Sequence, residues 1–110
     1  MPDLYVSNYV AMGMLDHGNE DTRTLIPLTA TEARQAAHMP SYRLVSIVNN
    51  YMLAQIYSKQ LDLPITSLRE KAMVEIGPDD YLLIGNYRGP KIEKYHPLPK
   101  INWWLLAPNQ

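Results

Sequence analysis

The 110-residue chain contains no cysteine, which excludes disulfides, thiolate nucleophiles and cysteine-ligated metals. It also lacks an apolar run long enough to span a membrane, and its first ten residues lack the basic and apolar segments of a signal peptide. The net charge of −1 argues against a protein that coats long nucleic acid, because such proteins carry a basic surplus. These absences favour a cytoplasmic domain that contacts neither a membrane nor long nucleic acid.

Familiar catalytic motifs are absent as well. The sequence contains no GxGxxG, no Walker loop and no GxSxG. The three histidines, His17, His38 and His96, have no partner three or four residues away that would make a metal site. We therefore predict no metal and no cofactor.

The few charges are distributed unevenly. Residues 81–110 hold four basic residues against a single acid, Glu93, and the basic residues are Arg88, Lys91, Lys94 and Lys100. A small anion can be bound locally at such an end without the whole protein being basic. The alternative is a solvated loop that carries several lysines, and charge alone favours this alternative.

Strand-like and helix-like segments alternate along the chain. We expect short strands at residues 4–10, 24–28 and 103–107, with Pro27 suiting the second strand to a sheet edge. Thr29 and Glu32 have the spacing of a capping box, which predicts a helix over residues 29–39 that Pro40 ends. The pattern predicts a single α/β domain over residues 1–110, with one mixed sheet of about five strands and helices mainly on one face.

A longer helix is expected from Ser41 to Leu61, because apolar residues recur there at helical spacing. It would carry Asn49 and Asn50 in its interior, where asparagine is less favourable than alanine by about 0.7 kcal/mol or less. Asparagine side chains also compete for backbone hydrogen bonds in such a position. Either the two residues face water, or one of them contacts a ligand.

The segments 70–76 and 81–87 read as two strands of a hairpin, joined by the tight turn GPDD. A symmetric register would place Arg69 opposite Arg88. Two like charges in that position are unfavourable unless an anion lies between them, and arginine suits phosphate. The alternatives are that each arginine pairs with a carboxylate such as Glu70 or Glu93, or that the register differs.

The opening LYVSNYVAMGML resembles that of the small viral ring nucleases, the anti-CRISPR family of archaeal viruses and phages. The matching positions there are Tyr5, Asn8, Met14 and Leu15. The similarity continues without a gap from the long helix to the second arginine, through Ala54, Ile56, Tyr57, Leu61, Arg69, Ile76, Leu82 and Arg88. NWWLLA resembles the last strand of the family, and the spacing of the two arginines is the strongest point.

The resemblance implies a ring-nuclease-like domain over residues 1–110 that forms a homodimer. In this family a cyclic oligoadenylate, the second messenger of type III CRISPR defence, lies in a cleft between the subunits. Arg69 and Arg88 would grip its phosphates. The family cleaves the ring without metal, and a histidine on the long helix protonates the leaving 5′ oxygen while a ribose 2′-hydroxyl attacks the phosphate.

This chain departs from the family pattern at three positions. Asn50 stands in the place of the histidine, Ala11 in that of a frequent serine, and Lys91 in that of a catalytic glutamate. An amide donates a hydrogen bond but does not transfer a proton at neutral pH. We therefore assign no catalytic residue, and assign ligand binding to Asn8, Ala11, Asn49, Asn50, Arg69, Arg88 and Lys91.

Three functions follow, in this order. The first is a viral anti-defence protein of the host cytoplasm that sequesters a cyclic oligonucleotide without efficient cleavage. The second is an inhibitor that uses the same fold to bind a host defence protein. The third is an active, metal-independent ring nuclease that uses His17, His38 or His96 instead.

Overall fold

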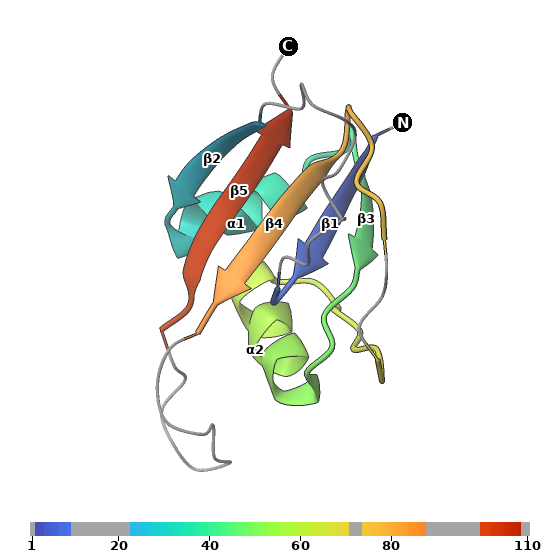
Figure 1. Ribbon diagram of the computed structural model, residues 1–110. Helices are drawn as coiled ribbons and strands as arrows, with labels where there is room; N and C mark the ends of the chain where they lie inside the picture. The colour runs from blue at the N-terminus through green and yellow to red at the C-terminus, as the bar shows by residue number, and fades with distance from the viewer. Residues whose placement is uncertain (1, 10–22, 71–73, 88–99, 109–110) are drawn as a thin grey trace.

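Five strands form one mixed sheet in the computed structural model, which describes residues 2–9, 23–70, 74–87 and 100–108 (Figure 1). The strand order is β2-β5-β4-β1-β3. The strand β1 is parallel to its neighbours β3 and β4, and β5 is antiparallel to both β4 and β2. The elements are β1 (Asp3–Ser7), β2 (Arg23–Leu28), α1 (Ala30–Ala37), β3 (Arg43–Ser46), α2 (Tyr51–Leu61), β4 (Tyr81–Asn86) and β5 (Asn102–Pro108).

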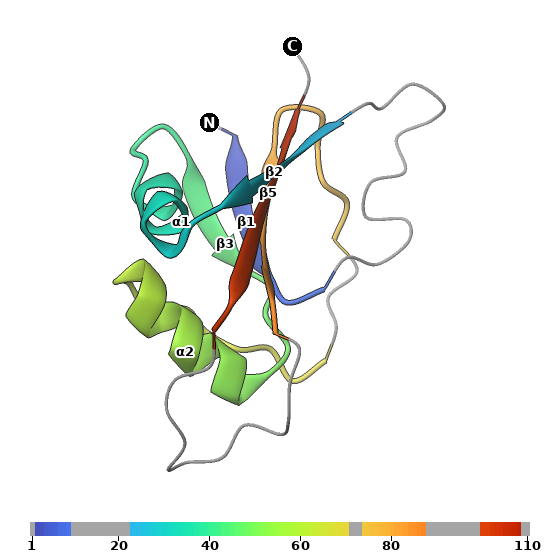
Figure 2. The same ribbon diagram turned by 90° about the vertical axis from the view of Figure 1, so that its left-hand side faces the viewer.

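Both helices cover the same face of this sheet, as Figure 2 shows. The larger core lies between them and the sheet, with Tyr57 and Trp103 at its centre and Leu4, Val6 and Leu83 around them. A smaller core lies on the opposite face, where Ile76 packs with Ile47, Leu82 and Leu106. The predicted α/β class, with one mixed five-stranded sheet and helices mainly on one face, is therefore confirmed.

Several local predictions are confirmed. The strand expected at residues 4–10 is β1, the one expected at 103–107 is β5, and the proline-containing strand β2 lies at an edge of the sheet. The capping box at α1 is formed in both directions: Thr29 Oγ1 accepts from the Glu32 backbone N–H at 3.1 Å, and Glu32 Oε1 accepts from that of Thr29 at 2.9 Å. Among the described residues, neither helix is long and apolar enough to cross a membrane.

The prediction of one long helix from Ser41 to Leu61 is wrong. Its first part is the strand β3, which pairs with β1 from Arg43 to Ser46, and only Tyr51–Leu61 is helical. A nearly continuous apolar run satisfies helical and strand spacing alike, and the β-branched residues Val45, Ile47 and Val48 favour the strand. Asn49 and Asn50 therefore lie between a strand and a helix, where asparagine is well suited.

The predicted hairpin is also wrong, although its turn and its second strand are present. The backbone N–H of Asp80 donates to Gly77 O at 3.1 Å, as expected for the tight turn, and β4 follows. β4 has β1 along one edge and β5 along the other, so residues 74–76 have no edge to pair with. The symmetric register that would face Arg69 with Arg88 is therefore not formed, and Arg88 itself lies outside the described residues.

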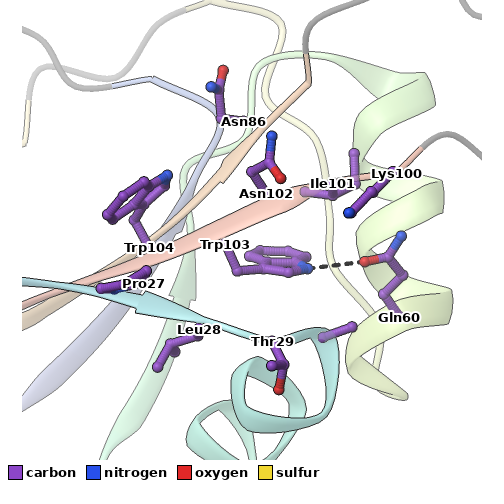
Figure 3. Close-up of a pocket in the computed structure, with 11 residues that line it drawn as sticks. Pro27, Leu28, Thr29, Gln60, Asn86, Lys100, Ile101, Asn102, Trp103 and Trp104 are labelled. Carbon is purple, nitrogen blue, oxygen red and sulfur yellow. Dashed lines mark hydrogen bonds between the residues drawn. The ribbon is translucent and has the colours of Figure 1, made fainter.

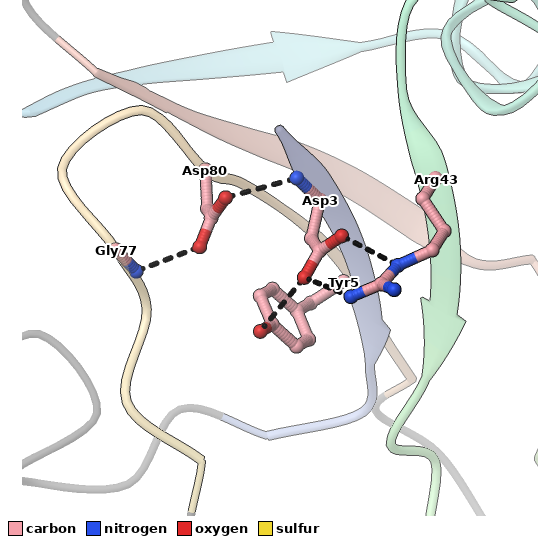
Figure 4. A network of polar contacts seen from close by, with 5 residues as sticks. All are labelled: Asp3, Tyr5, Arg43, Gly77 and Asp80. Carbon is pink, nitrogen blue, oxygen red and sulfur yellow. Dashed lines mark hydrogen bonds and ion pairs between the residues drawn. The ribbon is translucent and has the colours of Figure 1, made fainter. Parts of the chain in front are cut away.

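A polar network joins that turn to the start of β1 (Figure 4). Asp80 accepts from the Asp3 backbone N–H through Oδ1 at 2.9 Å and from the Gly77 N–H through Oδ2 at 2.8 Å. The carboxylate of Asp3 in turn accepts two hydrogen bonds from Arg43, at 2.8 and 3.0 Å, and one from Tyr5 at 3.3 Å. The network therefore links β1, β3 and the turn before β4.

We expect this network to weaken the protein in acid. The hydrogen bonds from Arg43 hold the pKa of Asp3 below its ordinary value of 3.8. A lowered pKa means that the native state favours the carboxylate, so the stabilisation is complete above pH 3.8 and is lost as the pH falls through the lowered value. Urea denaturation between pH 5 and pH 2 should show a smaller acid loss for Asp3→Asn than for the wild type. An equal loss in both proteins would contradict the assignment.

Candidate functional site

Two asparagines from distant parts of the chain hold each other at the carboxyl ends of β1 and β3. Asn8 follows β1, and its side chain donates to Asn49 Oδ1 at 2.8 Å. The backbone N–H of Asn49 donates back to Asn8 Oδ1 at 3.1 Å. Parallel strands present their carboxyl ends at the same edge of a sheet, which is where α/β proteins bind ligands. We call Asn8, Asn49 and Asn50 the asparagine cluster.

Asn50 is the N-cap of α2. Its Oδ1 accepts a hydrogen bond from the backbone N–H of Leu53 at 3.0 Å, which accounts for the second asparagine in structural terms. Because Oδ1 is used in this way, the exposed side chain offers its Nδ2 donors outward. The N-terminus of α2 adds a partial positive charge at the same place. The cluster therefore favours a ligand that accepts hydrogen bonds and carries negative charge.

The loop after α2 brings Arg69 to this end of the molecule. Ser67 forms a parallel bridge with Val48, and the Leu68 N–H donates to Val48 O at 2.7 Å. Arg69 is the residue after Leu68 in that loop, and Asn49 is the residue after Val48, so both lie just beyond the same bridge. The side chain of Arg69 is exposed. Asn8, Asn49, Asn50 and Arg69 are thus brought together. The other three predicted ligand residues, Ala11, Arg88 and Lys91, lie outside the described part of the chain.

Sequence reasoning missed three residues at the same end of the sheet. Tyr51, the first residue of α2, is 66% exposed and lies directly after Asn50 of the cluster. Asn86 ends β4 two residues after the pair formed by Ser7 and Ile84, and it lies opposite Asn102 of β5. The signal was an asparagine at or near one end of four strand segments, but it has meaning only once these strands are known to be neighbours.

These amides form a row across the end of the sheet. Asn49 follows β3, Asn8 follows β1, Asn86 ends β4 and Asn102 begins β5, and these four strands are consecutive neighbours. At about 4.8 Å between neighbouring strands, the row extends over about 14 Å. It is uncharged and offers both donors and acceptors. Such a row suits an extended polar ligand better than a single ion.

A groove of about 750 Å³ opens at the β5 end of this row (Figure 3). It forms where β2 leaves β5 after the pair of Leu28 and Trp103 and the chain turns into α1. Its lining consists of Pro27, Leu28, Thr29, Ala30, Gln60, Asn86, Lys100, Ile101, Asn102, Trp103 and Trp104. Asn86 and Asn102 belong to the groove and to the amide row, so the two features are continuous.

No histidine and no metal-binding cluster is found at this end among the described residues. His38 follows α1, and its Nε2 lies 2.7 Å from Leu61 O at the last residue of α2. The 11 residues of α2, about 16 Å of helix, separate Leu61 from Asn50. No group of three or more histidine, aspartate or glutamate residues is arranged to hold a metal in the ranges that the structure covers. His17 and His96 lie outside these ranges.

Comparisons with known proteins identify a structural relative. No protein-family model and no curated protein matches the chain. Among solved structures, the fold is similar to that of B116 of Sulfolobus turreted icosahedral virus, with a TM-score of 0.75 over 96% of this chain and 98% of that chain. The two sequences are 13% identical, so the likeness shows a shared fold. The chain therefore has the fold of a small protein of an archaeal virus.

Proposed function

We propose that this chain is a viral anti-defence protein that binds and sequesters a cyclic oligonucleotide of the oligoadenylate type without cleaving it efficiently. The observation that carries the proposal is the asparagine cluster beside the N-terminus of α2 and Arg69. Hydrogen-bond donors, a helix N-terminus and an arginine suit phosphate groups. Tyr51 adds an exposed aromatic ring on which a base can stack.

The identity of the ligand rests on the resemblance to viral ring nucleases. The similarity in fold to B116, an archaeal virus protein, supports a viral origin. In the family the ligand lies between two subunits, so we propose a homodimer in the cytoplasm of the host cell. The row of amides gives such a ligand polar contacts over about 14 Å on each subunit.

The capping role of Asn50 supports binding rather than cleavage. Its Oδ1 is engaged by the Leu53 N–H at 3.0 Å, and its Nδ2 group has no proton to give to a leaving oxygen at neutral pH. Asn50 can donate a hydrogen bond to a phosphate or ribose oxygen. It therefore suits ligand retention in the position where the family carries its general acid.

Retention of cyclic tetra-adenylate tests this function. The purified protein is mixed with the ring, separated by gel filtration and heated, and the released nucleotide is identified by chromatography. We expect intact ligand at one ring for each pair of chains. Arg69→Ala should weaken binding about 10- to 100-fold, since a hydrogen bond to a charged group contributes about 1.5–3 kcal/mol.

Arg34→Ala is the matched control, because Arg34 is an exposed arginine in the last turn of α1 and lies outside the site. It should bind as the wild type does. Release of linear products would overturn sequestration in favour of a ring nuclease. No retention of cyclic tetra-adenylate or of cyclic di- and trinucleotides would overturn both nucleotide functions.

A second candidate function is the inhibition of a host defence protein. Leu25 and Ile26 are 53% and 37% exposed, and they are consecutive residues of the edge strand β2. Exposed edge strands with large apolar side chains pair readily with other chains. Loss of inhibition in Leu25→Lys with unchanged nucleotide retention would favour this function over sequestration.

A further inference from the structure

The sheet face that lies away from the helices continues beyond the smaller core toward the start of β5. Leu106 of β5 belongs to that core, and Trp104 and Asn102 share its face because side chains alternate along a strand. Ile84 pairs with Trp104 and packs against the smaller core, which places the indole on the same face. Trp103 belongs to the larger core, so the two indoles lie on opposite sides of β5 (Figure 3). Trp104 and Asn102 therefore lie on one surface that the helices do not cover.

Trp104 offers an aromatic platform on this surface. Its side chain is half-buried, whereas Trp103 is only 1% exposed. Pro27 of β2 lies opposite Trp104, and because proline has no N–H the two form a non-hydrogen-bonded pair, in which side chains come closest. The exposed Pro27 and the half-buried Ile84 of β4 thus flank the indole on its two sides. An indole that is flanked in this way and remains partly exposed binds a nucleobase by stacking.

Two carboxamides lie next to the indole on the same face. Asn102 precedes Trp104 by two residues, a separation of about 6.8 Å along the strand. Asn86 lies directly opposite Asn102 on β4, so the two amides are neighbours. Within the described part of the chain, neither side chain makes a hydrogen bond. A carboxamide pairs with adenine through two hydrogen bonds, since it accepts from the 6-amino group and donates to N7.

This surface is close to the asparagine cluster. Asn8 follows β1 and Asn102 begins β5, and only β4 lies between these two strands. The strands β1 and β5 are therefore about 10 Å apart. The ribose and base of a nucleotide can cover this distance, so one ring can contact the cluster with its phosphates and the indole with a base.

We propose that Trp104, Asn86 and Asn102 form the subsite that selects adenine in the cyclic oligonucleotide. One adenine stacks on the indole, and the carboxamides bind its 6-amino group and N7. The subsite rests on the proposed function and adds to it the side chains that distinguish the base. Contacts to phosphate, such as those assigned to Asn50 and Arg69, carry no information about the base. Discrimination between rings of different bases is therefore assigned to the uncovered face of β4 and β5.

Adenosine tests the subsite apart from the ring, because it has no phosphate. The chain has two tryptophans and Trp103 is buried, so a saturable change in tryptophan emission on adding adenosine reports on Trp104. Asn102→Asp should weaken adenosine binding about tenfold and reduce the preference for adenosine over cytidine, since a carboxylate accepts from an amino group but donates nothing to N7. Gln35→Ala is the matched control, because it removes an exposed carboxamide from α1, on the other side of the sheet. It should bind adenosine as the wild type does.

Calorimetry with two further variants separates stacking from folding. Trp104→Phe should lose the emission change and keep most of the adenosine binding, because phenylalanine also stacks on a base. Trp104→Leu should weaken the binding of adenosine about tenfold or more. The absence of a saturable signal with folded wild-type protein would overturn the subsite. So would equal affinities for adenosine, guanosine and cytidine.

Retention of cyclic tetra-adenylate by the same variants separates the subsite from sequestration itself. Asn102→Asp and Trp104→Leu should each weaken retention about tenfold. If both variants retain the ring as well as the wild type does, the subsite is overturned and sequestration stands. If the wild type binds adenosine with the expected preference and retains no ring, sequestration is overturned and the base-binding surface is supported.

Discussion

Replacing Asn50 with histidine should turn the protein from a binder into a cleaving enzyme for cyclic tetra-adenylate. A positioned general acid contributes about 100- to 10,000-fold to a rate, and the amide of Asn50 supplies none of it. The ribose 2′-hydroxyl would attack the adjacent phosphate and lose its proton to solvent water, and the protonated histidine would give its proton to the 5′ oxygen as the bond between that oxygen and phosphorus breaks. The products would be linear, with a 2′,3′-cyclic phosphate end. Cleavage should increase as the pH falls toward about 6.5, where histidine becomes protonated.

Asn50→Ser is the matched control for this experiment. Serine caps helices about as well as asparagine, whereas histidine in the same place should cost about 1 kcal/mol of stability. The serine variant should therefore fold, bind the ring and release it intact. Single-turnover assays on the ligand-bound wild type and both variants give the comparison. If Asn50→His binds the ring and forms no linear product, a histidine at this position is not sufficient to restore cleavage.

Gly85→Ala should cause the largest loss of stability among the single substitutions considered. A Cβ at Gly85 would lie 2.5 Å from Cζ and 2.6 Å from Oη of Tyr57. That ring cannot move aside easily, because it is fully buried and packs against Trp103 with a centroid distance of 4.8 Å. Its hydroxyl also donates to Gly85 O at 2.6 Å. Overpacking together with the loss of this hydrogen bond should lower the free energy of unfolding by about 3 kcal/mol.

Urea denaturation measures this loss, and Tyr57→Phe separates its two parts. Removing the hydroxyl alone should cost about 1–2 kcal/mol, since it takes a partner from a buried carbonyl. Burial of this hydroxyl also raises the pKa of Tyr57, as expected for a phenol kept neutral in the core. Gly85→Ala should remain destabilising in the Tyr57→Phe background, because ring carbons at 2.5 and 2.8 Å still obstruct the new methyl group. If Gly85→Ala alone lowered the free energy of unfolding by less than about 0.5 kcal/mol, this result would contradict the packing described.

The sequence by itself determined the elements that depend on neighbouring residues. The capping box of Thr29 and Glu32 starts α1 through contacts three residues apart, and the tight turn closes between Gly77 and Asp80. The strands β1, β2 and β5 were predicted because alternating or β-branched apolar residues are bounded by turn residues there. The alternation of strands and helices was sufficient for the fold class.

Only the tertiary structure decided which apolar segments became strands. Arg43–Ser46 is a strand because β1 supplies a parallel edge forty residues earlier in the chain. No local pattern records that partner, and the helical spacing was equally good. Residues 74–76 remain outside the sheet for the converse reason, since both edges of β4 are already occupied by β1 and β5.

The same division applies to the candidate site. Asn8, Asn49, Asn50 and Arg69 were chosen from the sequence, and they do lie at one end of the sheet. The reasoning for Asn50 was nevertheless wrong, because it caps α2 instead of lying within a longer helix. The hydrogen bonds between Asn8 and Asn49 join residues 41 positions apart. The amide row, Tyr51 and the groove beside β5 depend on strand order, which arises from packing between distant segments and not from the spacing of residues along the chain.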